Sequence, residues 1–207
     1  LIKKKAKIII ISHLGRPKGI EVPELSLIPI YKYLKKSLQT EVFFFMGNLD
    51  HEVQEKFSHL KEGEIILLEN IRYFKEESND DENFSKRLGS LGDIYINDAF
   101  SCSHRKQASI HNITKYIKHC YAGPLLKREV EAIDLVIQNK KEPVTCIIGG
   151  SKISTKINVI SRLVKKVNNL IIVGAMANNF FAYKNLKVGK SLIEDNTKFV
   201  IKEIYKK

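Results

Sequence analysis

Residues 7–17, Lys7-Ile8-Ile9-Ile10-Ile11-Ser12-His13-Leu14-Gly15-Arg16-Pro17, join a short apolar run directly to a polar loop. Four consecutive isoleucines favour a buried strand, because β-branched side chains pack well on a pleated surface. The chain then turns polar and leaves His13 and Arg16 just past the end of this strand. In open α/β sheets, ligands bind outside the carboxyl ends of the strands. This stretch therefore predicts a parallel α/β fold and the sheet edge at which a ligand binds.

The same arrangement of strand and polar loop recurs three times along the chain. Ile65–Leu68 is followed by Arg72, Asp93–Ile96 by His104 and Arg105, and Val144–Ile148 by Lys152. A single basic residue at such a position is more often a solvated surface residue. Arg16, Arg72 and Arg105 at equivalent positions, with His13 beside them, favour a ligand site instead. Because Arg donates two parallel hydrogen bonds and stays charged, the ligand is predicted to be small and strongly anionic, with phosphate the natural candidate.

Short apolar runs alternate with amphipathic stretches along the whole chain, which predicts a parallel sheet covered by helices. The predicted strands are Lys7–Ser12, Glu41–Phe45, Glu64–Leu68, Asp93–Asn97, Val144–Ile148 and Leu170–Gly174. The predicted helices are Leu27–Leu38, Glu52–His59, Asn83–Leu91, Leu125–Gln138, Lys156–Val167, Ala177–Tyr183 and Glu194–Lys206. Residues 101–118 show no clear period. The helix Leu125–Gln138 fits a connector between two domains and a crossover helix within one sheet equally well.

The composition is that of a globular protein, with 43% apolar and 28% charged residues and a net charge of +12. The lysines are dispersed, which favours compositional drift plus a cationic pocket over a nucleic-acid surface. Cys102, Cys120 and Cys146 lie far apart without metal-ligand spacing, so they are predicted to be reduced thiols in a cytosolic protein. Ile8–Ile11 and Phe43–Met46 are too short to span a bilayer.

Three further polar residues, Glu69, Asn70 and Asp98, lie at the same predicted sheet edge. They fit either partners that orient the arginines or carboxylates in general acid–base catalysis. Carboxyl groups surrounded by Arg and Lys have lowered pKa values and are poor proton donors, which favours the orienting role. Asp98 fits a helix cap equally well.

The segment Gly149-Gly150-Ser151-Lys152-Ile153-Ser154-Thr155-Lys156 lacks the spacing of a P-loop. Its two glycines allow a ligand to approach the backbone, and Ser154 or Thr155 is predicted to cap a helix whose N-terminal amides attract phosphate. On that helix Lys152 and Lys156 would share a face, with a polyphosphate between them. The alternative is a strand-to-helix turn with solvated lysines. Val173-Gly174-Ala175-Met176 would give a second close approach to the backbone, for a nucleoside.

Six motifs in order strongly resemble the phosphoglycerate kinase family, particularly its bacterial form. They are SHLGRP (12–17), LLENIRYFKEE (67–77), INDAFSCSHRKQAS (96–109), AGPLLKREVEAI (122–133), GGSKISTK (149–156) and VGAMANNFF (173–181). The resemblance runs in register across essentially the whole chain. It implies two doubly wound, Rossmann-like parallel-sheet domains joined by a helix and hinge, both of them incomplete here.

The resemblance also implies which residues act and where the domains begin and end. Residues 1–121 would form an N-terminal 3-phosphoglycerate-binding domain, 122–139 the interdomain helix and hinge, and 140–207 the start of a nucleotide-binding domain. The implied substrate-binding residues are His13, Leu14, Gly15, Arg16, Arg72 and Arg105. The implied nucleotide-binding residues are Ser151, Lys152, Lys156 and Gly174. Lys152 and Arg16 would be catalytic, with Lys152 meeting the transferring phosphoryl group.

The chain departs from the family pattern in three places. The opening Asp-x-Asn-x-Pro motif and a substrate-binding arginine after it would precede Leu1. The Gly-Gly-Asp-Thr segment, whose Asp holds Mg²⁺, would lie beyond Lys207, so no metal ligand is expected within the chain. The glycine triplet of the second nucleotide motif is Val173-Gly174-Ala175.

The activity implied is reversible phosphoryl transfer between 1,3-bisphosphoglycerate and ADP, which gives 3-phosphoglycerate and ATP. The resemblance implies a cytoplasmic monomer that binds neither nucleic acid nor membranes. The 207 residues alone are expected to be inactive, because the Mg²⁺ ligand is missing, and to expose apolar sheet edges. Two alternatives are a basic nucleic-acid-binding protein and a non-catalytic protein that binds 3-phosphoglycerate only.

Overall fold

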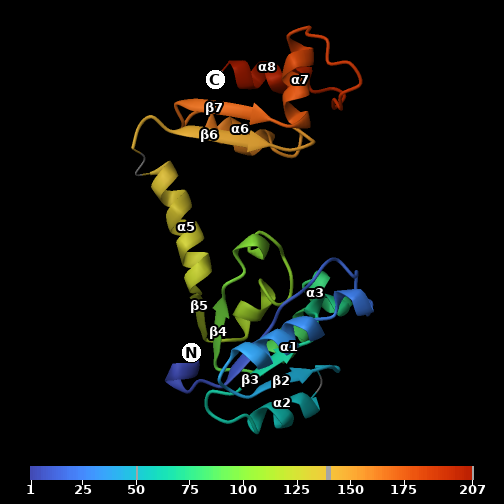
Figure 1. Ribbon diagram of the computed structural model, residues 1–207, viewed down its shortest axis with the longest axis vertical. Helices are drawn as coiled ribbons and strands as arrows, with labels where there is room; N and C mark the ends of the chain where they lie inside the picture. Colours follow the sequence, from blue (N-terminus) through green and yellow to red (C-terminus); the bar gives the residue numbers. More distant parts are fainter. Residues whose placement is uncertain (50, 139–140, 207) are drawn as a thin grey trace. The chain divides into compact units, whose positions relative to one another are not determined.

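In a computed structural model, which describes residues 1–49, 51–138 and 141–206, the chain divides into two compact units, Leu1–Glu129 and Val130–Lys207. Helix α5 (Pro124–Ile137) crosses the division between them. The domain boundaries at residues 121 and 139 remain predictions. Figure 1 shows the order of the elements along the chain.

The first unit contains a three-stranded parallel sheet in the order β1 (Ile8–Ile10), β3 (Ile65–Leu68), β2 (Val42–Phe45). All four residues of the central strand β3 are buried, which explains its continuously apolar sequence. Side chains alternate across the sheet: Phe44 stacks on Tyr31 of α1 (Ile28–Ser37), while Phe45 contacts Phe57 of α2 (His51–Ser58). Helices therefore cover both faces, as in a doubly wound fold (Figure 1).

A second parallel sheet in this unit pairs β4 (Ile94–Asn97) with β5 (His119–Ala122). The sequence analysis missed β5, because its four residues follow the aperiodic segment 101–118 and all four are exposed. The remaining helices of the unit are α3 (Lys75–Ser78), α4 (Glu82–Gly89) and the short 3-10 helices Ile2–Lys4, Pro23–Leu25, Ile71–Tyr73, Phe100–Cys102 and Asn112–Lys115. One core cluster, which includes Phe84, Leu88 and Ile113, packs α2, α4 and β3 together.

The second unit consists of a parallel pair of strands, β6 (Thr145–Gly149) and β7 (Asn169–Val173), with three helices, α6 (Ile157–Leu163), α7 (Ala175–Tyr183) and α8 (Lys198–Tyr205). Its core is formed by Ile153, Ile160, Met176, Phe180, Ile201 and Ile204. The face of the strands that bears Ile148 and Ile172 packs on this core, whereas Ile147 and Ile171 on the other face are exposed.

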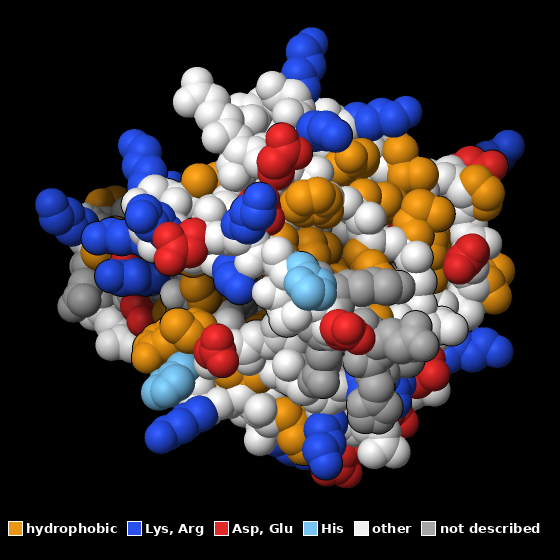
Figure 2. Space-filling view, turned by 90° about the horizontal axis from the view of Figure 1, so that it is seen from below, with side chains coloured by type: hydrophobic (Ala, Val, Ile, Leu, Met, Phe, Trp, Pro, Cys, Tyr) orange, Lys and Arg blue, Asp and Glu red, His pale blue; other side chains and the backbone are white. Residues whose placement is uncertain are grey.

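The α/β class and the parallel direction of every predicted strand are confirmed. The described chain differs from the prediction in that its strands form three short sheets rather than one sheet in each domain. The last helix begins at Lys198 instead of Glu194, because Glu194 makes a loop contact that is described below. Figure 2 shows Lys and Arg side chains mixed with acidic and apolar ones over the face seen there.

Candidate functional site

The loop after β1 is held in place by the segment that follows β3. Asn70, which is fully buried, donates through Nδ2 to the carbonyl oxygens of Leu14 (2.8 Å) and Leu25 (2.9 Å). Its Oδ1 accepts from the backbone N–H of Arg72 (3.1 Å), and the N–H of Ile71 donates to the carbonyl of Ser12. Asn70 therefore fixes the backbone of both segments, including that of Arg72, and does not contact a guanidinium as the predicted orienting role implied.

Gly15 gives this loop its shape. Its φ is +63°, a region that side chains with a Cβ rarely adopt, and a Cβ placed there would lie 2.7 Å from Leu25 Cδ2. The turn directs the carbonyl of Gly15 at Arg72, whose Nη1 donates to it over 2.9 Å.

Arg72 is only 8% exposed, and all of its side-chain partners are neutral. Besides Gly15, its Nη2 donates to Gln107 Oε1 at 3.4 Å and to Cys102 Sγ at 3.9 Å. In the part of the chain that the structure describes, no carboxylate forms an ion pair with it. Buried charges in proteins are normally paired, whereas Arg72 is hydrogen-bonded here to neutral groups; the buried carboxylate of Glu77 lies close enough for the charge of Arg72 to lower its pKa.

His13 belongs to the same cluster. Its Nε2 lies 3.8 Å from Cys102 Sγ. Burial lowers the pKa of the His13 imidazole below its ordinary value of 6.5, and the positive charges of Arg72 and Arg105 lower it further. Beside His13 lies a cavity of about 230 Å³ whose lining includes Cys102, Gln107 and Glu77. The structure thus places Arg72 and Arg105 close enough to His13 for both charges to act on its imidazole, as expected for residues of one site.

Arg16 is less closely integrated than the other two arginines. It lies in the loop after β1 and is exposed, and among the described residues it has no hydrogen bond or ion pair. Its backbone position next to Gly15 keeps it on the rim of the cluster.

Glu69 and Asp98 do not orient an arginine, so that part of the prediction is wrong. Glu69 accepts from Ser26 Oγ (2.6 Å) and from the N–H of Leu27 (2.7 Å), at the start of α1. Asp98 accepts from the N–H groups of Leu125 (2.6 Å) and Leu126 (3.0 Å). The alternative of a helix cap is correct for Asp98, but the helix is α5, far along the sequence.

In the second unit, the segment between β6 and α6 is an exposed loop fixed at its centre by the fully buried Ile153. Ser151, Lys152 and Lys156 are all exposed on it. The prediction of a side-chain cap is wrong: Thr155 Oγ1 donates to the carbonyl of Lys152, and Ser154 donates to Glu194. Because α6 begins only at Ile157, Lys152 precedes it, and the two lysines do not share a helix face.

The sequence analysis did not single out Glu194. Its Oε2 accepts from the N–H of Ser154 (3.1 Å) and its Oε1 from the Ser154 hydroxyl. These hydrogen bonds lower the pKa of the Glu194 carboxyl, and the charge of Lys152 lowers it further. Asn179 Oδ1 in turn accepts from the N–H of Glu194 (2.7 Å). A contact across 40 residues leaves no local signal in the sequence.

Gly174 lies where the ends of β6 and β7 meet. Its φ is +70°, and a Cβ at this position would lie 3.4 Å from the carbonyl oxygen of Gly150. The N–H of Met176 donates to that same oxygen (2.9 Å). The backbone after β7 thus lies against the glycine pair after β6, and the predicted approach of a nucleoside to Gly174 stays a prediction.

Among the described residues, no group of three or more His, Cys, Asp or Glu side chains is placed to hold a metal ion. No helix in the described ranges combines the length and hydrophobicity that a membrane span requires.

Parallel strands covered by helices, with cationic and glycine-rich loops at the strand ends, define a protein of the open α/β class, whose ligands bind at that edge. Within this class, residues 1–207 match the family model described as Phosphoglycerate kinase. The chain belongs to the phosphoglycerate kinase family.

Individual relatives agree with this assignment. Phosphoglycerate kinase of Bartonella bacilliformis is 45% identical over 207 residues, which are 100% of this chain and 52% of that protein. The enzyme of Wolbachia pipientis wMel is 46% identical over 195 residues, 94% of this chain and 48% of that protein. The solved phosphoglycerate kinase of Coxiella burnetii superimposes with a TM-score of 0.80 at 35% identity, covering 99% of this chain and 51% of that one. The chain spans about half the length of the relatives it matches.

Proposed function

We propose that this chain takes part in reversible phosphoryl transfer between the acyl phosphate of 1,3-bisphosphoglycerate and ADP, which yields 3-phosphoglycerate and ATP. The observation that carries this proposal is Arg72, a buried guanidinium with neutral partners, clustered with His13 and Arg105. Membership of the family supplies the identity of the anion.

The first unit would bind 3-phosphoglycerate. Arg72 and Arg105 would hold its phosphate and carboxylate, with His13 as a further donor and Arg16 approaching from the rim. The backbone of Leu14 and Gly15 would shape the loop, since Asn70 and Arg72 fix their carbonyl groups. A ligand with two anionic groups suits a cluster of several cationic side chains.

The second unit would bind the nucleotide. Lys156 would lie on the nucleotide phosphates, Lys152 would accompany the phosphoryl group as it moves, and Ser151 and Gly174 would line the nucleoside pocket. The exposure of both lysines supports this role, because they are free to follow a ligand.

The chemistry needs positioning and charge neutralisation more than proton transfer. Phosphoryl transfer proceeds in line through a loose transition state with charge spread over the equatorial oxygens. The carboxylate of 3-phosphoglycerate is ionised already, so it attacks without a catalytic base. Because the two ligands are assigned to different units, transfer requires the units to close and exclude water. Mg²⁺ would accompany ATP and ADP and neutralise part of the charge on their phosphates.

We further propose a cytoplasmic monomer without nucleic-acid or membrane partners. The three free cysteines support the cytoplasmic location.

Isothermal titration calorimetry tests the function directly. The 207-residue chain is titrated with 3-phosphoglycerate and with ADP, each alone and each in the presence of the other at saturation. We expect one site for each ligand and no competition between them. Glycerate, which lacks the phosphate, serves as the matched control and should bind far more weakly. Competition between the two ligands for one site would contradict the proposal, and binding of 3-phosphoglycerate without any ADP binding would favour the non-catalytic alternative.

A further inference from the structure

The guanidinium of the buried Arg72 is held by a neutral side chain, that of Gln107. A buried guanidinium needs acceptors to fix its plane, yet a carboxylate acceptor would cancel the charge that attracts an anion. In the described chain, the one side-chain oxygen that accepts from Arg72 belongs to Gln107, a neutral amide that is itself only 7% exposed. Gln107 therefore restrains the guanidinium without bringing a negative charge to it.

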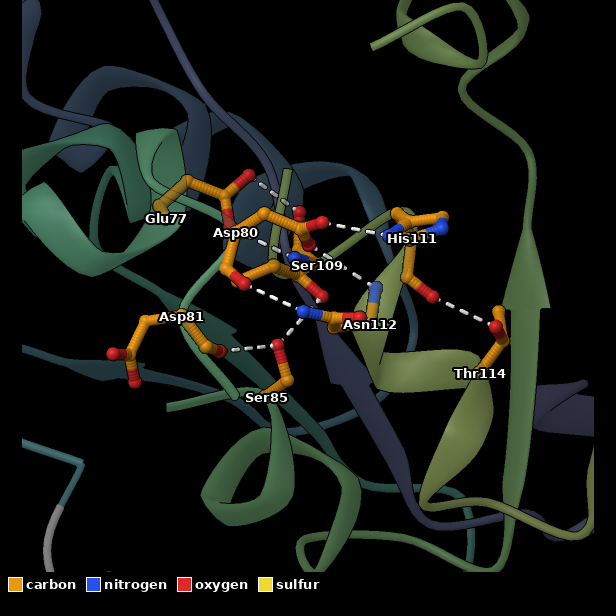
Figure 3. A network of polar contacts seen from close by, with 9 residues as sticks. Glu77, Asp80, Asp81, Ser85, Ser109, His111, Asn112 and Thr114 are labelled. Carbon is orange, nitrogen blue, oxygen red and sulfur yellow. Dashed lines mark hydrogen bonds and ion pairs between the residues drawn. The ribbon is translucent and has the colours of Figure 1, made fainter. Parts of the chain in front are cut away.

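Gln107 begins a segment that is tied down over its whole length. Glu77 accepts from the N–H of Ser109 (2.8 Å) through Oε2 and from the Ser109 hydroxyl (2.7 Å) through Oε1. The carbonyl of Glu77 also accepts from the N–H of Ala108 (3.0 Å). Figure 3 shows these carboxylate contacts, which join α3 to a segment some thirty residues further along.

Asp80 makes hydrogen bonds to the C-terminal end of the same segment, at His111 and Asn112. Its Oδ2 lies 2.6 Å from His111 Nδ1, its Oδ1 accepts from the N–H of Asn112 (3.2 Å), and its carbonyl accepts from Asn112 Nδ2 (2.5 Å) (Figure 3). Asp80 has a φ of +54°, so the backbone itself is turned to make these bonds. The N–H groups of Ile110 and His111 both donate back to the carbonyl of Gln107 (3.0 and 2.7 Å), which completes a rigid turn.

Glu77 is 2% exposed, and burial of a carboxylate is costly. Burial raises the pKa of the Glu77 carboxyl, while the hydrogen bonds from Ser109 and the charge of Arg72 act in the opposite direction. In the described structure this carboxylate forms no direct ion pair with Arg72, although it lies close enough to influence it. All of its hydrogen bonds are made to the segment that carries Gln107.

We propose that Gln107 is a positioning residue for Arg72, which it aims at an anionic ligand without neutralising it, and that Glu77 and Asp80 hold Gln107 in place. This inference rests on the proposed function only in that it takes 3-phosphoglycerate as the anion. Gln107 acts on the ligand through Arg72 and need not touch it.

The test measures the affinity of the 207-residue chain for 3-phosphoglycerate at low ionic strength in a set of variants. Gln107→Met keeps the volume and removes the oxygen, and we expect binding to weaken about tenfold, as for a lost hydrogen bond to a charged group. Gln107→Glu keeps an acceptor but places a carboxylate against Arg72, so it should weaken binding more than Gln107→Met does. Glu77→Gln, which retains one acceptor for Ser109, should weaken binding less than Gln107→Met.

Asp81→Ala is the matched structural control. Asp81 caps α4 by accepting from the N–H of Phe84 (2.7 Å) and has no side-chain bond to the Gln107 segment. Its loss should lower the unfolding temperature and leave the affinity within about twofold of the parent chain. A purely structural role for Gln107 predicts instead that affinity falls in step with stability in all variants, and that Gln107→Glu binds no worse than Gln107→Met. Either result would overturn the proposal.

Arg72→Ala separates this inference from the proposed function. Loss of binding in Arg72→Ala together with unchanged binding in both Gln107 variants overturns the positioning role alone. Unchanged binding in Arg72→Ala overturns the assignment of 3-phosphoglycerate to this site, and the inference with it.

A measurement on the unmodified chain covers the case in which the Gln107 variants do not fold. In nitrogen-15 NMR of arginine side chains, we expect slow rotation and a protected signal for the Arg72 guanidinium, with the exposed Arg16 as the fast reference in the same spectrum. Equal mobility of the two guanidinium groups would contradict a restrained Arg72.

Discussion

The segments that follow β3 and β6 both leave a parallel strand and both carry basic residues, yet they hold their charges in opposite ways. In the first unit the main charge, Arg72, is buried and fixed by neutral acceptors. In the second, Lys152 and Lys156 are exposed, and the loop is fixed instead by the buried Ile153 and the carboxylate of Glu194. The first arrangement suits a ligand that must be held still, and the second suits a group that moves during the reaction.

This contrast predicts that basic residues of the two units affect different kinetic constants. Removal of a basic side chain from the first unit should weaken substrate binding, whereas removal of one from the second unit should mainly lower kcat.

The largest effect is expected for Lys152→Ala, tested in a protein extended to the full length of its relatives. If Lys152 follows the migrating phosphoryl group, its removal should lower kcat by about two orders of magnitude or more and change either KM far less. Steady-state kinetics with both substrates varied provide the measurement, and Lys166→Ala, on the same unit but outside the loop, serves as the control. A change in the nucleotide KM alone would show that Lys152 binds the nucleotide in the ground state only. The basic residues of the two units would then not differ in the kinetic constants that they affect.

Arg72→Ala should have the next largest effect, on binding. The loss of a charge-assisted contact is expected to weaken 3-phosphoglycerate binding by roughly 1.5–3 kcal/mol, with ADP affinity nearly unchanged. Arg16→Ala is the matched comparison, because it removes the same charge from an exposed position on the adjacent loop and should cost less. Calorimetric titration of both variants decides the point. If Arg72→Ala weakened ADP binding as much as 3-phosphoglycerate binding, the division of ligands between the units would be wrong.

Gly15→Ala probes the geometry that directs the loop at Arg72. A residue with a Cβ at φ +63° costs about 1–2 kcal/mol, and the new methyl would press on Leu25. Chemical denaturation should therefore show a loss of about that size. Gly92→Ala should change stability much less, because Gly92 lies in the same unit without a positive φ and a Cβ there would lie 4.0 Å from the carbonyl oxygen of Ile94. Equal losses in the two variants would show that the turn at Gly15 is not strained.

The smallest expected effect is the pH dependence that comes from protonation of His13. Because the pKa of His13 is lowered in the folded chain, the imidazole there binds fewer protons than in the unfolded chain. Stability without ligand should therefore fall as the pH drops below about 6.5 and through the folded value. An anionic ligand offsets the repulsion from Arg72 and Arg105, so 3-phosphoglycerate binding near pH 6 should be accompanied by proton uptake.

Calorimetry in two buffers of different ionisation enthalpy measures that uptake. His13→Gln separates it from the titration of the ligand's own phosphate. The same proton uptake in His13→Gln and in the parent chain would show that His13 does not take part.

The parts of this account that were predictable from sequence are those encoded locally. Runs such as Ile8–Ile11 and Ile65–Leu68 predict strands by their side chains alone. Arg16 and Arg72 could be placed at one edge because the parallel strands β1 and β3 end together. The strand His119–Ala122 could not be found, because its exposed side chains have no period and its partner β4 is distant in sequence.

The contacts that position the basic residues were also beyond sequence reasoning. Asp98 caps α5 and Glu194 holds Ser154 through bonds between residues 27 and 40 positions apart, where no spacing rule applies. Gln107 is an ordinary polar residue in the sequence and becomes informative only when it is seen buried against Arg72. The motifs located the site, and tertiary contacts determine how each charge in it is held.

The division of ligands between the two units is tested most directly by mapping each ligand on the chain with NMR chemical shifts. Titration with 3-phosphoglycerate should shift the signals of His13, Gly15, Arg72 and Arg105 and leave those of residues 149–156 and Gly174 unchanged. Subsequent titration with ADP should shift the second set and leave the first unchanged. Shifts of Ser151–Lys156 on addition of 3-phosphoglycerate, or an unperturbed Arg72, would contradict the account.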